Sequence, residues 1–129
     1  MTDYDYEILA KTIFGEARGE SFAGQVAIAC VVINRWKAHK WFSGKSIAST
    51  CLKPYQFSCW NKSDPNSQIL AKLPYTTYSK YFPAIKEAIN NDITVGATHY
   101  HVRGLNPAWA KNHKPCKQIG AHLFYNDIE

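Results

Sequence analysis

Signals for export or membrane insertion are missing from this sequence. The first seven residues are acidic, whereas a secretory signal begins with positive charge and continues into a long apolar segment. The longest apolar run, Val26 to Ile33, is eight residues long, far short of the roughly 20 that span a bilayer. We therefore expect a chain that is synthesised in the cytoplasm without a signal peptide and does not insert stably into a membrane.

Motifs of several enzyme and binding classes are absent as well. There is no glycine-rich phosphate loop, no G-x-S-x-G nucleophile turn, and neither an H-E-x-x-H nor a C-x-x-C zinc motif. Lys and Arg outnumber Asp and Glu by 15 to 10, and the net charge of +5 favours an anionic partner. The lysines are scattered, however, with no basic run of the kind found in nucleic-acid-binding arms. We expect neither a nucleic-acid partner nor a cofactor.

Cysteines are also few. The chain has four, at positions 30, 51, 59 and 116, which is sparse for a disulfide scaffold. Cys30 lies within the apolar run and is typical of a small core residue. Cys51 and Cys59 flank a turn, so a disulfide between them is the minor alternative to four free thiols.

What is present fits one monomeric domain covering residues 1–129, a length that buries roughly two-thirds of the unfolded surface. Helical spacing precedes short strands, which predicts a mainly helical α+β domain with a small antiparallel sheet. The run 26–33 also suits an interior strand, but its length and its alanines favour a helix. The predicted helices are Asp5–Ala17, Phe22–Trp36, Ser46–Leu52 and Pro83–Asn91; the strands are Gln56–Trp60, Thr98–Val102 and Ile119–Tyr125; the loops are Asp64–Ser67 and Gly104–Pro115.

Glu16 is the first candidate for chemistry. At about 100° per residue it falls about 20° from Leu9 on the first predicted helix, at the margin of the apolar stripe. One interpretation is a solvated residue that pairs loosely with Arg18 or Lys11, and periodicity alone favours it. The other is a general acid whose protonated form is favoured by the apolar surface beside it.

The histidines are a second candidate. His99 and His101 share one face of a predicted strand, and His113, Cys116 and His122 follow nearby, a set of residue types that binds zinc. The alternative is that these side chains form hydrogen bonds within the sheet or line a cleft. Because no recognisable zinc-ligand spacing is present, we expect no metal.

Aromatic residues make up 14% of the chain, and many of them fit the core. Trp60, Tyr100 and Trp109 lie in predicted strands or loops beside polar residues, where exposed rings can stack on sugar faces. Core packing explains these three equally well on composition alone.

Three parts of the sequence together resemble a known family. Residues 13–20 read I-F-G-E-A-R-G-E and lead into G-Q-V-A-I-A-C-V-V-I-N-R at 24–35; residues 55–58 read Y-Q-F-S; and G-A-T-H-Y-H, N-P-A-W-A and I-G-A-H-L-F-Y follow at 96–101, 106–110 and 119–125. In content and order these resemble the SleB-type cell-wall hydrolases, the family of spore-cortex-lytic enzymes that also includes phage lysins. The resemblance covers residues 5–125.

This resemblance implies a lysozyme-like fold and cleavage of the bond between N-acetylmuramic acid and N-acetylglucosamine in peptidoglycan glycan strands. It also implies that Glu16 is the catalytic residue and that the Q-F-S segment lines the cleft opposite it. Glu20 would share the face of Glu16 only if the helix continued past Gly19, and ordinary charge pairing explains it at least as well. The predicted substrate-binding residues are Glu20, Gln56, Phe57, Ser58, Tyr100 and Trp109.

The reaction type is predicted from the scarcity of carboxylates. Hydrolysing glycosidases generally use two carboxylates, about 5–9.5 Å apart, whereas a lytic transglycosylase needs one. Apart from Glu16 and Glu20, the acidic residues lie at the termini, in predicted loops or around one predicted helix. We therefore predict a lytic transglycosylase that forms 1,6-anhydro-muropeptides. A two-carboxylate muramidase, a zinc-dependent wall amidase or peptidase, and a non-enzymatic wall-binding module are the alternatives.

The expected biological setting is a bacteriophage. Members of the family that act on spores usually carry an export signal and an added wall-binding domain, and neither is found in this sequence. The sequence therefore predicts an endolysin that is made in the host cytoplasm and reaches the cell wall through a holin.

Overall fold

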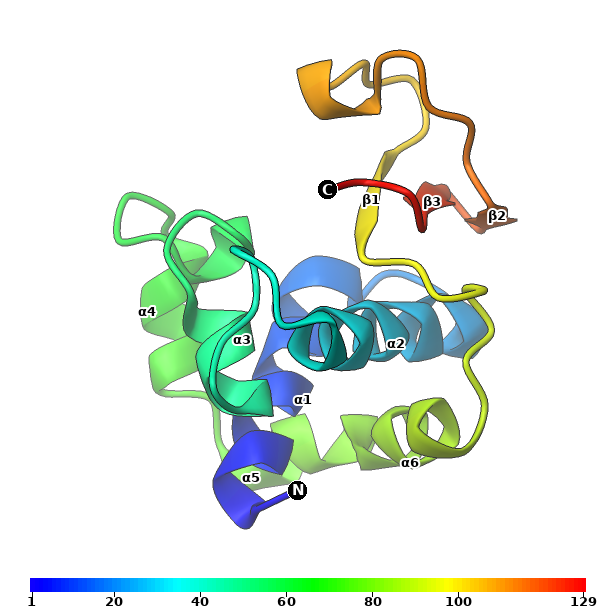
Figure 1. Cartoon of the computed structure of the whole chain (residues 1–129). Helices are drawn as coiled ribbons and strands as arrows, with labels where there is room; N and C mark the ends of the chain where they lie inside the picture. The colour runs from blue at the N-terminus through cyan, green and yellow to red at the C-terminus, as the bar shows by residue number, and fades with distance from the viewer.

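The computed structural model describes all residues from Met1 to Glu129. A bundle of helices carries a small three-stranded sheet on one side (Figure 1). None of the helices combines the length and the apolar character that crossing a membrane requires. In chain order the elements are α1 (Asp3–Ala17), α2 (Phe22–Ala38), α3 (Ile47–Leu52), the 3-10 turn η1 (Ser58–Trp60), α4 (Asn66–Ala71), α5 (Tyr75–Tyr78), η2 (Ser79–Tyr81), α6 (Phe82–Asn90), β1 (His99–Val102), η3 (Ala108–Ala110), β2 (Lys117–Ile119) and β3 (His122–Tyr125).

Helix α1 begins two residues earlier than the apolar stripe predicts, because Thr2 caps it. The Thr2 hydroxyl accepts a hydrogen bond from the backbone N–H of Asp5, whose carboxylate accepts one from the Thr2 N–H in return. The second oxygen of Asp5 accepts from the Ala48 N–H, 2.9 Å away at the start of α3. One side chain therefore caps α1 and joins it to α3.

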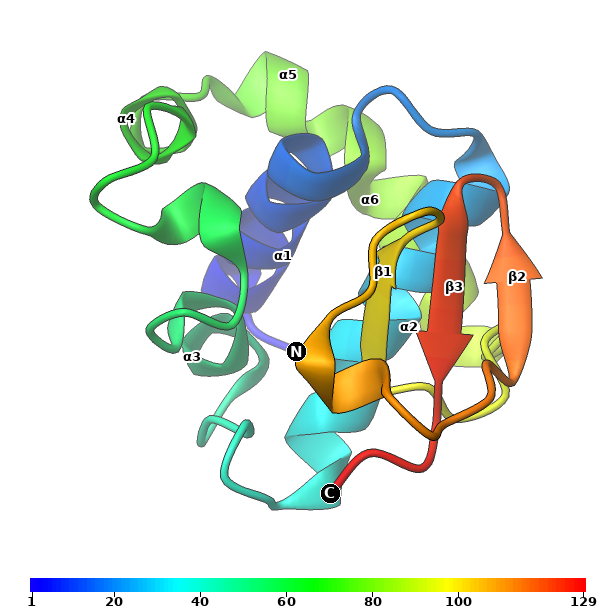
Figure 2. The same cartoon turned by 90° about the horizontal axis from the view of Figure 1, so that it is seen from above.

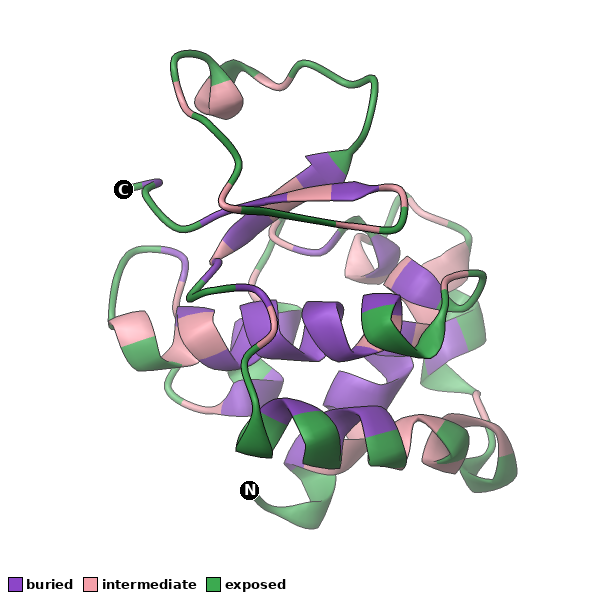
Figure 3. Ribbon diagram, turned by 90° about the vertical axis from the view of Figure 1, so that its right-hand side faces the viewer, coloured by how far each residue is buried: buried purple, intermediate pink, exposed green.

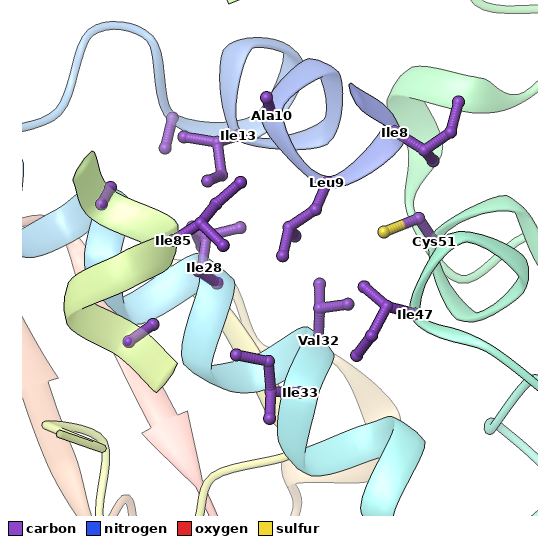
Figure 4. Close-up of a cluster of buried hydrophobic side chains, with 14 of the residues drawn as sticks. Ile8, Leu9, Ala10, Ile13, Ile28, Val32, Ile33, Ile47, Cys51 and Ile85 are labelled. Carbon is purple, nitrogen blue, oxygen red and sulfur yellow. The ribbon is translucent and has the colours of Figure 1, made fainter. Parts of the chain in front are cut away.

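Helix α2 is the central element of the domain. Val26 through Val32 are each at most 1% exposed, so the helix predicted for this apolar run is confirmed. Figure 4 shows Leu9 of α1, Val32 of α2 and Ile85 of α6 pointing into one cluster. A helix that is apolar on all sides needs neighbours on all sides, and α2 has them in α1, α3, α6 and the sheet.

The sheet lies on the face of α2 that the other helices leave free. Its strand order is β1-β3-β2, antiparallel throughout, with His101 opposite Leu123 and Ile119 opposite His122. Phe124 of β3 packs against Ala27 and Val31 of α2 in a second, smaller core cluster. Figure 2 shows the strands stacked over α2, and Figure 3 shows buried residues in both the sheet and α2. The predicted mainly helical α+β domain with a small antiparallel sheet is confirmed.

The strand predicted at Gln56–Trp60 is wrong. This segment contains η1, in which the Trp60 N–H donates to the Phe57 carbonyl 3.0 Å away. Phe57 and Cys59 are buried, which produces the alternation that suggested a strand. No neighbouring strand lies beside the segment to pair with it, so the backbone closes its hydrogen bonds locally instead.

Further segments differ from the prediction. The predicted loop Gly104–Pro115 contains η3, and α5 and η2 were not predicted. The predicted loop Asp64–Ser67 contains the start of α4, because the Asp64 carboxylate accepts from the Asn66 N–H and helps to begin the helix. The single strand predicted at Ile119–Tyr125 contains the last residue of β2, a turn at Gly120 and the whole of β3, and the Gly120 φ of +57° suits glycine. The Cys51–Cys59 disulfide does not form, since all four cysteines are free.

Candidate active site

Glu16 lies in the last turn of α1 and is half-buried. The helix ends at Ala17, one residue later, so the carboxylate stands at the edge of the core, as its position on the apolar stripe predicts. The phenolic O–H of Tyr100, on β1, donates a hydrogen bond to Glu16 Oε1. The first helix and the sheet, far apart in the sequence, therefore meet at this carboxylate.

Tyr100 remains a hydrogen-bond donor over the whole physiological pH range. Burial of its hydroxyl, and after that the negative charge of Glu16, raise the pKa of Tyr100 well above its ordinary value. A phenol that stays neutral donates a hydrogen bond to the carboxylate and does not repel its negative charge. The pair is therefore fixed in one polarity, with Tyr100 donating and Glu16 accepting.

Arg35 supplies positive charge from the last turns of α2. It is 5% exposed, and its guanidinium lies over the ring of Phe57 at 4.8 Å from the centroid. Its Nη1 donates to Gln56 Oε1 at 3.1 Å, and its Nε donates to the Thr98 carbonyl just before β1. Burial lowers the pKa of Arg35, and the negative charge of the Glu16 carboxylate opposes that effect. Arg35 therefore links the segment after α3 to the sheet, and its positive charge attracts the Glu16 carboxylate.

A cavity of about 390 Å³ opens around these groups. It gathers residues from α1, α2 and the loop after α2, from the segment after α3 that leads into η1, and from β1, η3 and the C-terminus. Both polar groups and large aromatic rings line it, as is typical of sites that bind a sugar. Its lining residues are Glu16, Arg35, Trp41, Tyr55, Gln56, Ser58, His99, Tyr100, Trp109, Ile128 and Glu129.

Four of the six predicted substrate-binding residues line the cavity of Glu16: Gln56, Ser58, Tyr100 and Trp109. Phe57 does not, because it is 1% exposed and packs beneath Arg35. Its role in the Q-F-S segment is structural, because its ring packs under Arg35, which lines the cavity.

Glu20, the sixth, lies elsewhere. Because α1 ends at Ala17, the chain turns before Glu20, and its carboxylate reaches the turn that precedes β3. There Oε1 lies 3.2 Å from Nδ1 of His122, an ion-pair distance without hydrogen-bond geometry, and accepts weakly from the Ala121 N–H at 3.4 Å. The charge-pairing interpretation of Glu20 fits this arrangement, and the residue has no place in the cavity.

The predicted histidine set is dispersed among different partners. Nε2 of His101 is 2.8 Å from the Tyr125 hydroxyl, His113 pairs with Asp127 at 3.1 Å, and His122 faces Glu20. No group of three or more His, Cys, Asp or Glu side chains in the chain is close enough together to hold a metal ion. These side chains form the sheet and loop contacts that were the alternative to zinc binding.

Sequence analysis missed five lining residues: Arg35, Trp41, Tyr55, Ile128 and Glu129. Arg35 follows Ile28, Val31 and Val32 by seven, four and three residues, so it continues the buried face of α2; a charged residue in that position was an available signal. Trp41 and Glu129 had no such signal. They are brought together by the fold, where the Trp41 Nε1–H donates to the Glu129 carbonyl at 3.3 Å.

The backbone next to Glu16 approaches η1 closely. A Cβ on Gly15 would lie 2.7 Å from Cys59 Cβ and 2.8 Å from its Sγ. We expect Gly15→Ala to lower the free energy of unfolding by about 1–3 kcal/mol through overpacking, although alanine is otherwise the better helix residue. Gly19→Ala is the matched control, since nothing lies within 4 Å of its Cβ position.

Denaturant unfolding of both variants checks this prediction. Adding Cys59→Gly to Gly15→Ala removes both close atoms and should recover part of the loss in a double-mutant cycle. Equal stability of Gly15→Ala and Gly19→Ala would contradict the close approach.

His99, which lines the cavity, makes stability depend on pH. Burial, and then the charges of Arg35 and Lys40, lower its pKa from 6.5 to about 4. The folded state therefore binds this proton less readily than the unfolded state. The contribution of His99 to stability is complete above pH 6.5 and is lost as the pH falls towards about 4, by up to about 3 kcal/mol.

Unfolding curves at several pH values check the effect. His99→Asn should flatten the decline of the free energy of unfolding between pH 6.5 and about 4. The control is His39→Asn, because His39 is exposed at the end of α2 with φ +52°, a conformation that asparagine also adopts. Identical slopes for wild type and His99→Asn would exclude His99 as the source.

The fold and the cavity together define a lysozyme-like α+β domain, with a glutamate at a helix end facing a groove between helices and sheet. Comparison with known proteins identifies the family to which this domain belongs. The chain belongs to the Cell Wall Hydrolase family, which matches residues 19–125. It is 32% identical to a spore cortex-lytic enzyme of Bacillus subtilis over 96% of this chain and 38% of that protein. It is 30% identical to one of Halalkalibacterium halodurans, over 97% and 36%. The chain thus spans little more than a third of the length of these curated relatives.

Solved structures show the same fold. The catalytic domain of the Bacillus cereus SleB protein superposes with a TM-score of 0.76 at 26% identity, covering 96% of this chain and 91% of that one. The catalytic domain of the germination-specific lytic transglycosylase SleB from Bacillus anthracis has a TM-score of 0.76 at 27% identity, covering 97% and 96%. This chain therefore corresponds to nearly all of those catalytic domains. The predicted SleB-type family is confirmed.

Proposed function

We propose that this protein degrades peptidoglycan by cleaving the glycosidic bond between N-acetylmuramic acid and N-acetylglucosamine, as a lytic transglycosylase with Glu16 as its acid and base. The observation that carries the proposal is the cavity itself, in which one carboxylate receives a hydrogen bond from Tyr100 and faces a ring of polar and aromatic side chains. Support also comes from the family and from the relatives named for cortex lysis and transglycosylation.

The mechanism needs two proton transfers at one group. Protonated Glu16 gives its proton to the glycosidic oxygen as the bond to C1 of the muramic acid breaks. The resulting carboxylate then takes the proton of the C6 hydroxyl of the same sugar, whose oxygen closes on C1 as a 1,6-anhydro ring. Glu16 ends protonated, no water is consumed, and the products are an anhydro-muramic end and a free N-acetylglucosamine end.

The neighbours of Glu16 fit this cycle. Arg35 and the Tyr100 O–H stabilise the carboxylate that exists between the two transfers. Gln56 accepts from Arg35 through its oxygen, which leaves its amide nitrogen to donate to a sugar oxygen. The half-buried ring of Trp109 provides an apolar surface for a sugar face. We assign Gln56, Ser58 and Trp109 to substrate binding, assign Tyr100 to positioning Glu16, and withdraw Phe57 and Glu20 from substrate binding.

A two-carboxylate muramidase is the second candidate, and one observation favours it. Glu129 lines the same cavity as Glu16 and is exposed, so it is the available second carboxylate in place of Glu20. In a hydrolase it would hold a water molecule on the far side of the sugar. Glu129→Gln separates the two reactions: it should leave transglycosylation within about threefold of wild type and reduce hydrolysis by 10²-fold or more, roughly the contribution of a general base.

Digestion of purified peptidoglycan tests the proposed function. We expect soluble muropeptides that end in muramic acid to be released, and to be released equally when EDTA is present, because the reaction uses no metal. Loss of release on chelation would favour the zinc-dependent amidase or peptidase. Binding to the wall without any release would favour the non-enzymatic binding module.

The setting of this activity stays a prediction. An endolysin released from the host cytoplasm through a holin, acting as a monomer, fits the sequence analysis. Expression in bacteria with and without a co-expressed holin checks it, since lysis is expected only with the holin.

A further inference from the structure

A long segment without acidic residues lies beside the cavity of Glu16. From Ser21 to Ser63 the chain contains no Asp or Glu, whereas it contains Arg35 and five lysines. The segment forms α2, α3 and the turns around α3. Helix α2 runs beneath the sheet, and α3 with its flanking turns lies on the side of the molecule away from β2 (Figure 2). A basic protein that concentrates its unopposed charge next to its cavity has a local preference for anions.

Four of these lysines line two hollows, of which the first adjoins the cavity and the second adjoins the first. The first hollow, about 510 Å³, includes Lys53 and Lys62, and the second, about 870 Å³, includes Lys40, Lys45 and Lys53. No acidic residue lines either hollow. We refer to Lys40, Lys45, Lys53 and Lys62 as the lysine surface.

Tyr55 joins the lysine surface to the active-site cavity. It lines both the Glu16 cavity and the first hollow, and its side chain is 85% exposed. Its φ is +64°, a conformation that costs energy for a bulky residue and that recurs at binding sites. A ligand that leaves the cavity over Tyr55 enters the first hollow directly.

The four lysines have no partner within the protein. None of them takes part in an ion pair, in contrast to Lys11, which pairs with Glu7 at 2.9 Å. Lys40, Lys45 and Lys62 are exposed, and Lys53 is half-buried. Their ammonium groups are therefore free to contact an anion, and their mutual repulsion is relieved when one binds.

We propose that the lysine surface binds the carboxylates of the stem peptide carried by the glycan strand that occupies the Glu16 cavity. The proposal rests on the proposed function and names a second part of the same substrate. Each muramic acid bears its peptide on a lactyl group, so a strand held at Glu16 presents a carboxylate-rich branch within reach of the neighbouring hollows. Tyr55 lines both the cavity and the first hollow, and this continuity favours a ligand attached to the same muramic acid whose bond is cut, which is the stem peptide, over the phosphates of teichoic acid.

Exposed ion pairs contribute little singly, so the surface acts through several of them and is sensitive to salt. The test compares Lys53→Gln/Lys62→Gln with the matched control Lys114→Gln/Lys117→Gln. The control lysines are exposed, unpaired, and lie at β2 and just before it, outside both hollows. Both double variants lose the same charge.

Each protein is assayed on glycan strands with intact stem peptides and on strands from which an amidase has removed them. For each protein we take the ratio of kcat/KM on peptide-bearing strands to kcat/KM on stripped strands. We expect this ratio to be the same for the control as for wild type. For Lys53→Gln/Lys62→Gln the ratio should fall about fivefold to tenfold at low salt, and less at high salt. Binding of peptide-bearing strands to the same variants in a Glu16→Gln background should weaken by a similar factor.

Three outcomes would overturn the proposal: an equal loss in the control pair, an equal loss on stripped strands, or competition by purified teichoic acid but not by free stem peptide. The proposed function is judged separately. If wild type cuts stripped strands and the ratio does not change, only the peptide site fails; if wild type cuts neither substrate, the proposed function fails while the binding assay still tests the lysine surface.

Discussion

Replacing Glu16 with glutamine is expected to reduce peptidoglycan cleavage by 10²- to 10⁴-fold, the usual contribution of a general acid and base. Glutamine has nearly the same shape, and its carbonyl oxygen can still accept the hydrogen bond from the Tyr100 hydroxyl. What it loses is the ability to carry a proton to the glycosidic oxygen and to take one back. Because both steps depend on this group, kcat should fall while binding of the glycan strand is kept.

Glu20→Gln is the control for this experiment. It removes a glutamate four residues away that faces His122 rather than the cavity. We expect its activity to stay close to that of wild type. Release of soluble muropeptides per unit time, with thermal unfolding to verify the fold, checks both variants. Activity of Glu16→Gln within about threefold of wild type would mean that Glu16 does not perform the chemistry.

Tyr100→Phe is expected to have the second largest effect, a loss of about 10- to 100-fold in kcat with little change in KM. The variant keeps the ring and removes only the O–H that donates to Glu16 Oε1. Hydrogen bonds to a charged acceptor are among the strongest in proteins, and losing this one leaves the carboxylate less stabilised and free to rotate. Catalysis depends on a carboxyl group held at the scissile bond, so the damage falls on kcat.

Tyr125→Phe provides a matched control on the same sheet. It also removes a hydroxyl, one that lies 2.8 Å from His101 Nε2, but this hydroxyl does not contact Glu16. Steady-state kinetics and melting temperature are measured for both. If the two variants lose activity equally, or if Tyr100→Phe raises KM with kcat unchanged, Tyr100 acts through the fold or through substrate binding and not by positioning Glu16.

The main architecture was predictable because its signals are local. The apolar run of α2 has no polar face, and only a central position buries it completely. The margin of the stripe on α1 placed Glu16 at the edge of the core. Capping groups set the ends: Ser46 begins α3 where expected, and Thr2 begins α1 earlier than the apolar pattern alone predicts.

The wrong strand prediction at Gln56–Trp60 arose because buried and exposed side chains can alternate in a segment that is not a strand. Phe57 and Cys59 alternate with exposed Ser58, yet both are buried against helices by a 3-10 turn. The same turn explains the Q-F-S segment: Gln56 and Ser58 face the cavity while Phe57 supports Arg35 from beneath. Periodicity reports which side chains are buried, but it does not distinguish a strand from a turn that buries the same residues.

The composition of the cavity depends on contacts that have no sequence signature. Glu129 was set aside as a terminal residue, and only the fold brings it beside Trp41 at the cavity. Glu20 was retained because it shares a motif with Glu16, and the end of α1 at Ala17 turns it away. Whether a carboxylate belongs to the site is decided by where a helix stops and where the chain returns.

The mass of the cleaved muramic acid ends tests the central claim most directly. Wild-type protein is incubated with purified peptidoglycan, and the soluble products are separated and weighed by mass spectrometry before any chemical reduction. A single carboxylate that recovers its proton from the C6 hydroxyl predicts 1,6-anhydro-muramic ends, lighter by one water molecule than hydrolysed ends and resistant to borohydride reduction. Products that carry only reducing muramic acid ends, with their formation abolished in Glu129→Gln, would contradict the account and identify a two-carboxylate hydrolase.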